Sequence, residues 1–96
     1  MRTTYIVTYD VADEKRLRRV FRLCKDYGTH LQFSVFECDL SPREKIEFEE
    51  KLKSEIKADK DQVLFIALGP ALGRGDRVIS ALGLPYSKFD AACFVV

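Results

Sequence analysis

The sequence predicts an α+β domain in which two helices cover one face of a β-sheet. The residues from Tyr5 to Tyr9 are all β-branched or aromatic, which is typical of a strand that is at least half buried. The apolar residues of the next segment recur at the spacing of a helix, at Leu17, Val20, Phe21 and Cys24. The run from Val63 to Leu68 is apolar without alternation, as expected of a strand covered on both faces.

The turn between the first strand and the first helix is expected to be short. Asp10 is the first charged residue after the strand, and Val11 and Ala12 leave no room for a long loop. We therefore expect Asp13 or a neighbour to cap the helix. Gly28 follows the last helical turn, where a residue of left-handed conformation is expected.

The second helix has a specific start signal. Ser41-Pro42-Arg43-Glu44 is a capping box with proline at the first helical position, and the apolar stripe after it predicts a helix to about Ala58. Between the two helices, the segment Leu31 to Cys38 indicates one strand with apolar residues on both faces. Two short strands are expected after residue 70, around Val78 to Leu82 and around residues 91–96.

Length and composition predict a single domain spanning residues 1–96. The longest apolar run is far shorter than the roughly 20 residues of a membrane span, and the N-terminus leads directly into the first strand. We expect a soluble protein without a signal peptide. The three cysteines form no Cys-x-x-Cys pair, so neither a disulfide framework nor a zinc site is indicated, and a cytoplasmic location fits best.

A second copy of the chain is predicted to complete the fold. Two helices can cover only one face of the sheet, whereas Leu31 to Cys38 and Val63 to Leu68 carry apolar residues on both faces. In so small a protein, the simplest cover for the other face is another copy, with the two sheets stacked about a twofold axis. The prediction is a homodimer.

Basic residues are concentrated on the first helix, although the net charge of the chain is only +1. They are Lys15, Arg16, Arg18, Arg19, Arg22 and Lys25. Planar guanidinium groups suit phosphate well, so one interpretation is a surface that binds nucleic acid. The other interpretation is a solvated helix face.

Asp10 places a carboxylate at the end of a sheet strand, beside the start of this basic helix. Carboxylates are ligands of divalent cations such as Mg²⁺, so one interpretation of Asp10 is a metal ligand next to a surface that attracts phosphate. The alternative is that Asp10 caps the turn that follows it.

Two motifs resemble those of the CRISPR-associated protein 2 family. The first runs from Tyr9-Asp10-Val11 through Asp13-Glu14-Lys15-Arg16-Leu17-Arg18-Arg19-Val20, and the second is Tyr27-Gly28-x-x-x-Gln32-x-Ser34-Val35-Phe36-Glu37. The resemblance covers nearly the whole chain. It implies a ferredoxin-like antiparallel sheet with two helices on one face, and dimers with stacked sheets. That fold needs two strands between the helices, so either the segment Leu31 to Leu40 bends or the topology is a variant.

The resemblance also implies a function and a site. It implies metal-dependent hydrolysis of phosphodiester bonds in RNA or double-stranded DNA, at the spacer-acquisition stage of a CRISPR system. Asp10 would be the catalytic, metal-binding carboxylate, paired with its copy from the second protomer, and Mg²⁺ or alternatively Mn²⁺ the metal. Tyr9, Arg16, Arg18 and Arg19 are the expected nucleic-acid contacts.

A non-catalytic role is the alternative function. The same family implies a dimeric scaffold that binds nucleic acid and the CRISPR integrase, and this role would not require Asp10. One residue departs from the family pattern, because His30 stands where arginine is usual. A neutral imidazole is a weaker phosphate contact at pH 7, which argues against efficient nuclease action. The other interpretation of His30 is a loop residue without a role.

Overall fold

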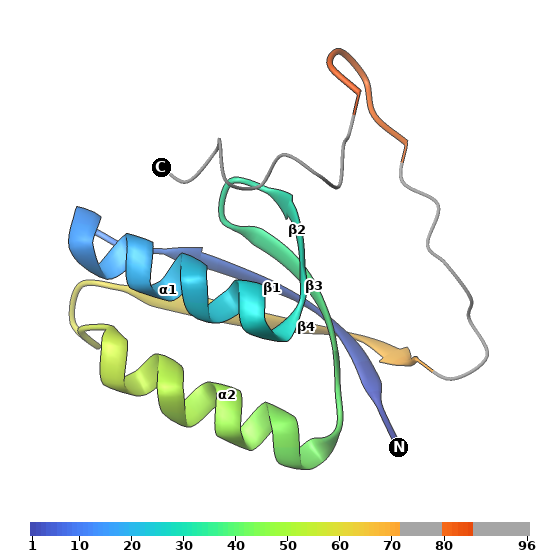
Figure 1. Ribbon diagram of the computed structural model, residues 1–96, viewed down its shortest axis with the longest axis horizontal. Helices are drawn as coiled ribbons and strands as arrows, with labels where there is room; N and C mark the ends of the chain where they lie inside the picture. Colours follow the sequence, from blue (N-terminus) through green and yellow to red (C-terminus); the bar gives the residue numbers. More distant parts are fainter. Residues whose placement is uncertain (72–79, 86–96) are drawn as a thin grey trace.

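The computed structural model describes residues 1–71 and 80–85. The elements are β1 (Thr3–Asp10), α1 (Glu14–Tyr27), β2 (Thr29–Gln32), β3 (Val35–Leu40), α2 (Pro42–Glu55) and β4 (Gln62–Pro70). The strands form an antiparallel sheet in the order β2-β3-β1-β4, and both helices lie on one face of it (Figure 1). This βαββαβ arrangement is ferredoxin-like, so the predicted fold class is confirmed.

Strand β1 is the centre of the sheet because it pairs with β3 on one side and β4 on the other. Val7 and Tyr9 are buried against the helices, whereas Ile6 and Thr8 are only partly buried. Side chains alternate between the two faces of a strand, so Asp10 shares the face of Ile6 and Thr8, opposite the helices. Asp10 is exposed at the end of this strand.

The prediction of one strand between the helices is wrong, because the chain reverses direction between β2 and β3. Phe33 and Ser34 form the turn, and Phe33 takes a φ of 28°. The pairing also shifts register between His30 and Gln32. The bend supplies the two strands that the ferredoxin-like pattern needs, and it places Phe33 at a turn instead of on a strand face.

The core fills the space between the sheet and the helices. Its buried apolar members are Val7, Tyr9, Val20, Phe21, Cys24, Phe36, Cys38, Leu40, Phe48 and Leu52. Aromatic rings link the layers: the Phe48 ring of α2 stacks on Tyr27 with centroids 4.3 Å apart and meets Phe65 of β4 edge-on at 5.5 Å. Such contacts fix the two helices against each other and against the sheet.

The predicted start of α2 is confirmed, and its predicted end is wrong. The Ser41 side chain accepts from the Glu44 backbone amide at 3.1 Å, and the Glu44 side chain accepts from the Ser41 amide at 2.9 Å. The helix ends at Glu55, before the expected Ala58, and Ile56 is its C-terminal cap. Ile56 still packs against the core, which explains why the apolar stripe continues past the helix.

Gly28 is required for a different reason from the predicted one. Its φ is −161°, which is extended backbone and not the left-handed conformation expected there. Instead, a Cβ at this position would clash with Cys38 Sγ and lie 2.5 Å from Glu37 O. The close approach of the chain to β3 therefore requires glycine.

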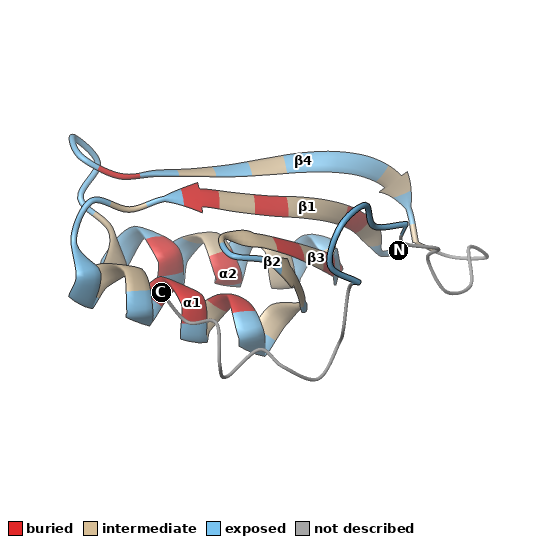
Figure 2. Cartoon of the chain, turned by 90° about the horizontal axis from the view of Figure 1, so that it is seen from above, coloured by how far each residue is buried: buried red, intermediate tan, exposed pale blue. Residues whose placement is uncertain are grey.

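Strand β4 is covered on only one face by the described part of the chain. Val63 and Phe65 pack against the core, whereas Leu64, Ile66 and Leu68 are 45%, 48% and 41% exposed. Figure 2 shows both helices on the same side of β1 and β4, with long exposed stretches along β4. The expected cover on both faces is thus not provided within residues 1–71 and 80–85.

Part of the predicted C-terminal half lies outside the described residues. These include the strand expected around residues 91–96, Cys93, and residues 78 and 79 of the strand expected around Val78 to Leu82. Residues 80–82 are described and form no strand. No helix in the part of the chain that the structure describes is long and apolar enough to cross a membrane. Cys24 and Cys38 are free and buried, and burial raises the pKa of the Cys38 thiol to about 12.

Candidate functional site

Asp10 is the last residue of the central strand, where it pairs with Gln62 of β4. Its side chain is exposed and lies on the face of the sheet that the helices leave open. Among the described residues, no hydrogen bond or ion pair engages the Asp10 carboxylate. It is a charge at the end of a sheet strand with no structural partner there.

Other carboxylates do the capping that was the alternative role for Asp10. The Asp13 side chain is the N-cap of α1 and accepts from the Arg16 amide at 3.0 Å. The Ala12 amide, within the turn itself, donates to Asp61 Oδ1 at 3.0 Å. The structure therefore assigns the capping role to Asp13 and Asp61, not to Asp10.

Asp61 is a buried carboxylate that joins the turn before α1 to the turn before β4. It accepts from Arg16 Nε at 2.7 Å and Arg16 Nη2 at 3.1 Å, and also from the amides of Ala12 and Lys57 at 3.0 and 2.9 Å. Its side chain is fully enclosed, and that of Arg16 is 15% exposed. The Arg16 guanidinium, assisted by these amides, holds the pKa of the Asp61 carboxyl far below its usual range.

No local pattern in the sequence indicates this clasp between Arg16 and Asp61, because the two residues are 45 positions apart. The only local sign is an aspartate just before an apolar strand. The clasp lies next to the candidate metal ligand, since Asp61 precedes Gln62, the partner of Asp10 in β4. It thus fixes both ends of the short connection that begins at Asp10.

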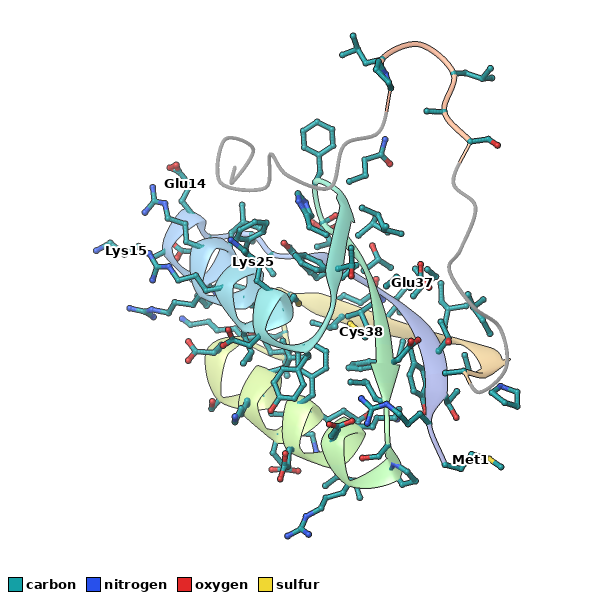
Figure 3. The ribbon with its side chains drawn as sticks, turned by 45° about the vertical axis from the view of Figure 1, so that its right-hand side comes forward. Met1, Glu14, Lys15, Lys25, Glu37 and Cys38 are labelled. Atoms are coloured by element: carbon teal, nitrogen blue, oxygen red, sulfur yellow. The ribbon has the colours of Figure 1, made fainter. Side chains whose placement is uncertain are left out.

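The predicted nucleic-acid contacts on α1 divide into two kinds. Arg16 forms an ion pair with Asp61, and the nucleic-acid contact expected of it stays a prediction. Arg18 and Arg19 are exposed, and the pair of Arg18 with Glu14, at 3.8 Å, is solvent-exposed on both sides and therefore weak. Figure 3 shows Glu14 and Lys15 extending away from the sheet at the first turn of α1. The outer side of α1 is thus open to an anionic partner.

Tyr9 is buried, although it was predicted as a nucleic-acid contact. It is only 6% exposed, and its ring stacks on Phe36 with centroids 6.3 Å apart. Burial, and to a lesser degree the neighbouring Cys24, raise the pKa of Tyr9 well above its ordinary value, so the phenol stays neutral. Tyr9 is therefore a core residue whose exposed remainder faces the pocket described next.

A pocket of about 220 Å³ lies where the end of β1, the first half of α1 and the β2–β3 turn meet. It is lined by Tyr9, Asp10, Val11, Leu17, Phe21, Phe33 and Ser34. Asp10 is the one charged residue among these, and most of the others are apolar or aromatic. The pocket is therefore a largely apolar cavity, and Asp10 at the end of β1 is the charged residue at its edge.

His30, the departure from the family pattern, lies in β2 and has structural contacts. Its Nε2 is 2.9 Å from the Phe33 carbonyl oxygen. Its ring lies 5.1 Å from that of Phe21 and 4.9 Å from that of Phe36. His30 therefore stabilises the β2–β3 turn. Because it lies in a strand and has these contacts, the interpretation of His30 as a loop residue without a role is wrong.

A complete metal site is absent from the described part of one chain. No group of three or more His, Cys, Asp or Glu side chains there could hold a metal ion. A single Asp10 carboxylate would need further oxygen ligands from elsewhere. Mg²⁺ accepts such an arrangement, because it keeps several waters and takes one or two carboxylates together with substrate phosphate.

Comparisons with known proteins agree with the two sequence motifs. Residues 2–71 match the profile of the family described as CRISPR associated protein Cas2. A CRISPR-associated endoribonuclease Cas2 of Rhodospirillum rubrum is 37% identical over 92 residues, which are 96% of this chain and 89% of that protein. A CRISPR-associated endoribonuclease Cas2 of Thermodesulfovibrio yellowstonii is 40% identical over 83 residues, which are 81% of this chain and 91% of that protein.

The fold agrees as well. The crystal structure of Streptococcus pyogenes Cas2 at pH 6.5 superposes with a TM-score of 0.66 at 38% sequence identity, covering 80% of this chain and 99% of that one. The resemblance inferred from the motifs is thereby confirmed. The chain belongs to the CRISPR-associated protein Cas2 family.

Proposed function

We propose that this protein is a metal-dependent endonuclease that hydrolyses phosphodiester bonds in RNA during the spacer-acquisition stage of a CRISPR system. The observation that carries the proposal is the Asp10 carboxylate, which is exposed at the end of the central strand and has no structural partner among the described residues. The name endoribonuclease, borne by the relatives from Rhodospirillum rubrum and Thermodesulfovibrio yellowstonii, supports RNA over double-stranded DNA.

The active form is a homodimer in this proposal. Leu64, Ile66 and Leu68 form an exposed apolar row on the open face of β4, and Asp10 lies on the same face. Stacking two sheets through this face would bury the row and bring two Asp10 side chains toward the twofold axis. Two carboxylates, with waters and a substrate phosphate, make a ligand set suited to Mg²⁺, with Mn²⁺ as an alternative.

The residues around Asp10 have distinct roles in the reaction. A divalent metal held at Asp10 would supply a water of lowered pKa and would neutralise charge on the phosphate. Asp10 would hold that metal, while Arg18 and Arg19 bind the phosphates that flank the reacting one. Arg16 and Asp61 position the turn that follows Asp10, and Tyr9 forms part of the pocket wall.

A cleavage assay with matched variants tests the proposal. Wild type, Asp10→Asn and Asp59→Asn are compared on single-stranded RNA and on duplex DNA, with Mg²⁺, Mn²⁺ or chelator. Asp59 is a suitable control because it is an exposed aspartate in the turn before β4. Cleavage of RNA that needs a divalent metal, persists in Asp59→Asn and is lost in Asp10→Asn is the expected result. Undiminished cleavage by purified Asp10→Asn protein would refute the catalytic assignment.

A non-catalytic scaffold that bridges nucleic acid and the CRISPR integrase is the second candidate. It is favoured by features that need no carboxylate, namely the exposed arginines of α1 and the apolar row on β4. Wild type that binds nucleic acid but cleaves neither RNA nor DNA with any divalent metal would support the scaffold.

A further inference from the structure

Phe33 is the one exposed aromatic side chain within residues 1–71 and 80–85, at 66%. It lies in the β2–β3 turn and has a backbone φ of 28°, a conformation that residues other than glycine rarely adopt. A bulky residue in this conformation lowers the stability of the folded protein. Because the Phe33 ring is exposed to solvent, its burial does not offset that loss. Strain of this kind is concentrated at functional sites, where the surrounding structure maintains it.

The turn that carries Phe33 is fixed to the end of the strand that carries Asp10. The Tyr9 amide donates to the Ser34 carbonyl oxygen at 3.2 Å, and His30 Nε2 lies 2.9 Å from the Phe33 carbonyl oxygen. Tyr9 is the immediate neighbour of Asp10. The position of Phe33 relative to Asp10 is thus set by a backbone hydrogen bond to Tyr9 and by the contact of the His30 side chain with the Phe33 carbonyl oxygen.

Phe33 and Asp10 line the same pocket of about 220 Å³. Its other walls include Leu17 and Phe21 of α1, and Lys25 Nζ lies 5.6 Å from the centre of the Phe21 ring. The cavity therefore combines an exposed ring, apolar walls and a positive charge beside one wall, with Asp10 at its edge. A flat aromatic group attached to a phosphate fits this combination.

We propose that the pocket binds one unpaired nucleobase, which stacks on the Phe33 ring while the adjoining phosphate lies beside Asp10. The proposal rests on the proposed function and specifies its substrate as a single strand. A base in a single strand can leave its neighbours and present its face to an aromatic side chain, whereas a base within a duplex is stacked on both sides. Single-stranded RNA is thus preferred over duplex DNA at this site.

A tryptophan in place of Phe33 reports this contact directly. The sequence contains no tryptophan, so the variant Phe33→Trp carries a single indole whose fluorescence is measured without background. In chelator, a single-stranded RNA oligonucleotide is expected to quench the emission saturably, and a duplex of the same sequence is not. Ile46→Trp is the matched control, because Ile46 is 61% exposed on α2; its emission should not respond.

Removing the ring gives the size of the contact. Loss of one base–aromatic stack weakens binding by roughly 5- to 150-fold, so Phe33→Ala should raise the Kd for single-stranded RNA by about this factor and leave duplex binding nearly unchanged. Phe33→Tyr should retain the affinity. Phe33→Gly should lose affinity as Phe33→Ala does, without loss of thermal stability, because glycine relieves the unfavourable φ. A residue that merely supported the turn would show the opposite pattern.

Three outcomes would overturn the proposal. They are unquenched emission from Phe33→Trp on addition of RNA, an equal loss of single-stranded and duplex binding in Phe33→Ala, and emission from Phe33→Trp that changes with protein concentration alone. The last would show that a second copy of the chain covers the pocket. Binding is measured without metal, so a cleavage result that refutes the role of Asp10 leaves the nucleobase assignment standing, and the reverse also holds.

Discussion

The Arg16 guanidinium and the Asp61 carboxylate form a two-point ion pair, at 2.7 and 3.1 Å, that ties the first turn of α1 to the start of β4. The remaining acceptor positions of Asp61 bind the amides of Ala12 and Lys57. Each partner that is lost would leave buried donors or a buried charge unsatisfied.

Removing either side of this pair should therefore destabilise the protein. We expect Asp61→Ala and Arg16→Ala each to lower the urea midpoint of unfolding clearly, and the double variant to lower it by less than the sum of the two. Arg18→Ala is the control, because its exposed pair with Glu14 should contribute no more than about 0.5 kcal/mol. Additive effects of the two substitutions would show that the pair is not coupled.

Acid should weaken the protein partly through Asp61. Its pKa is depressed in the folded state, so this carboxylate contributes stability above the ordinary aspartate pKa of about 4, and that stability is lost as the pH falls below this value. Asp61→Asn should show a shallower decline in unfolding free energy between about pH 5 and pH 2. The depressed pKa values of Asp13 and Glu44 act in the same direction in both proteins, so the difference between the two curves isolates Asp61.

Much of the fold could be predicted because local signals carried it. The capping box at Ser41 and the apolar periodicity of α1 depend on neighbouring residues alone. The β2–β3 turn could not be predicted in the same way. A turn residue with positive φ is usually glycine or asparagine, whereas this turn has Phe33 and Ser34. Reversal there is imposed by pairing with β1 and by the contact of His30 with the Phe33 carbonyl.

The kind of candidate site, a carboxylate beside a basic helix, could be predicted from the sequence, but the contacts of its residues could not. Asp10 could be singled out because a charge directly follows an apolar strand. The role of Arg16 could not, because its partner Asp61 is brought to it only by the folded sheet. The need for glycine at position 28 comes from the proximity of Cys38 and Glu37 on β3, which no local pattern in the sequence indicates.

The arginines of α1 should differ in their contribution to nucleic-acid binding. Each phosphate contact contributes about 0.7 to the slope of log affinity against log salt for single strands. Arg18→Ala combined with Arg19→Ala should reduce this slope by about 1.4, because both side chains are exposed. Arg16→Ala should change it by less, since its guanidinium is engaged by Asp61. A larger change for Arg16→Ala than for Arg19→Ala would contradict this assignment.

The apolar row on β4 should hold the proposed dimer together. Ile66 is 48% exposed and lies opposite Ile6 of β1, in the middle of the open face. Full burial of an exposed isoleucine contributes about 1.5 to 3 kcal/mol, of which roughly half remains to be gained at Ile66, and a twofold interface contains two copies. Ile66→Lys should thus raise the dimer dissociation constant at least about 10-fold.

Sedimentation velocity measures this change. Ile46→Lys provides the comparison, because Ile46 is also a largely exposed isoleucine but lies on α2, away from the open face. That variant should sediment like the wild type. A wild type that stays monomeric at high concentration, or an Ile66→Lys variant as dimeric as the wild type, would show that another surface, or none, makes the dimer.

Metal binding should be visible as a change in thermal stability. If two Asp10 carboxylates lie close together in the dimer, they repel each other when no metal is present. Asp10→Asn removes both charges with little change of shape, so without metal it should be as stable as the wild type or slightly more stable. Mg²⁺ at about 100 times its dissociation constant would stabilise the wild type by about 2.7 kcal/mol and Asp10→Asn by much less.

Differential scanning calorimetry with and without Mg²⁺ makes the comparison, and Asp59→Asn should respond to Mg²⁺ as the wild type does. The experiment requires no substrate, so it separates metal binding from catalysis. If Mg²⁺ stabilises the protein through Asp10 but no cleavage is seen, the protein is a non-catalytic scaffold that binds a metal. Equal stabilisation of wild type and Asp10→Asn by Mg²⁺ would show that Asp10 is not a metal ligand. A ligand stabilises the folded protein only through the residues that bind it in the folded state.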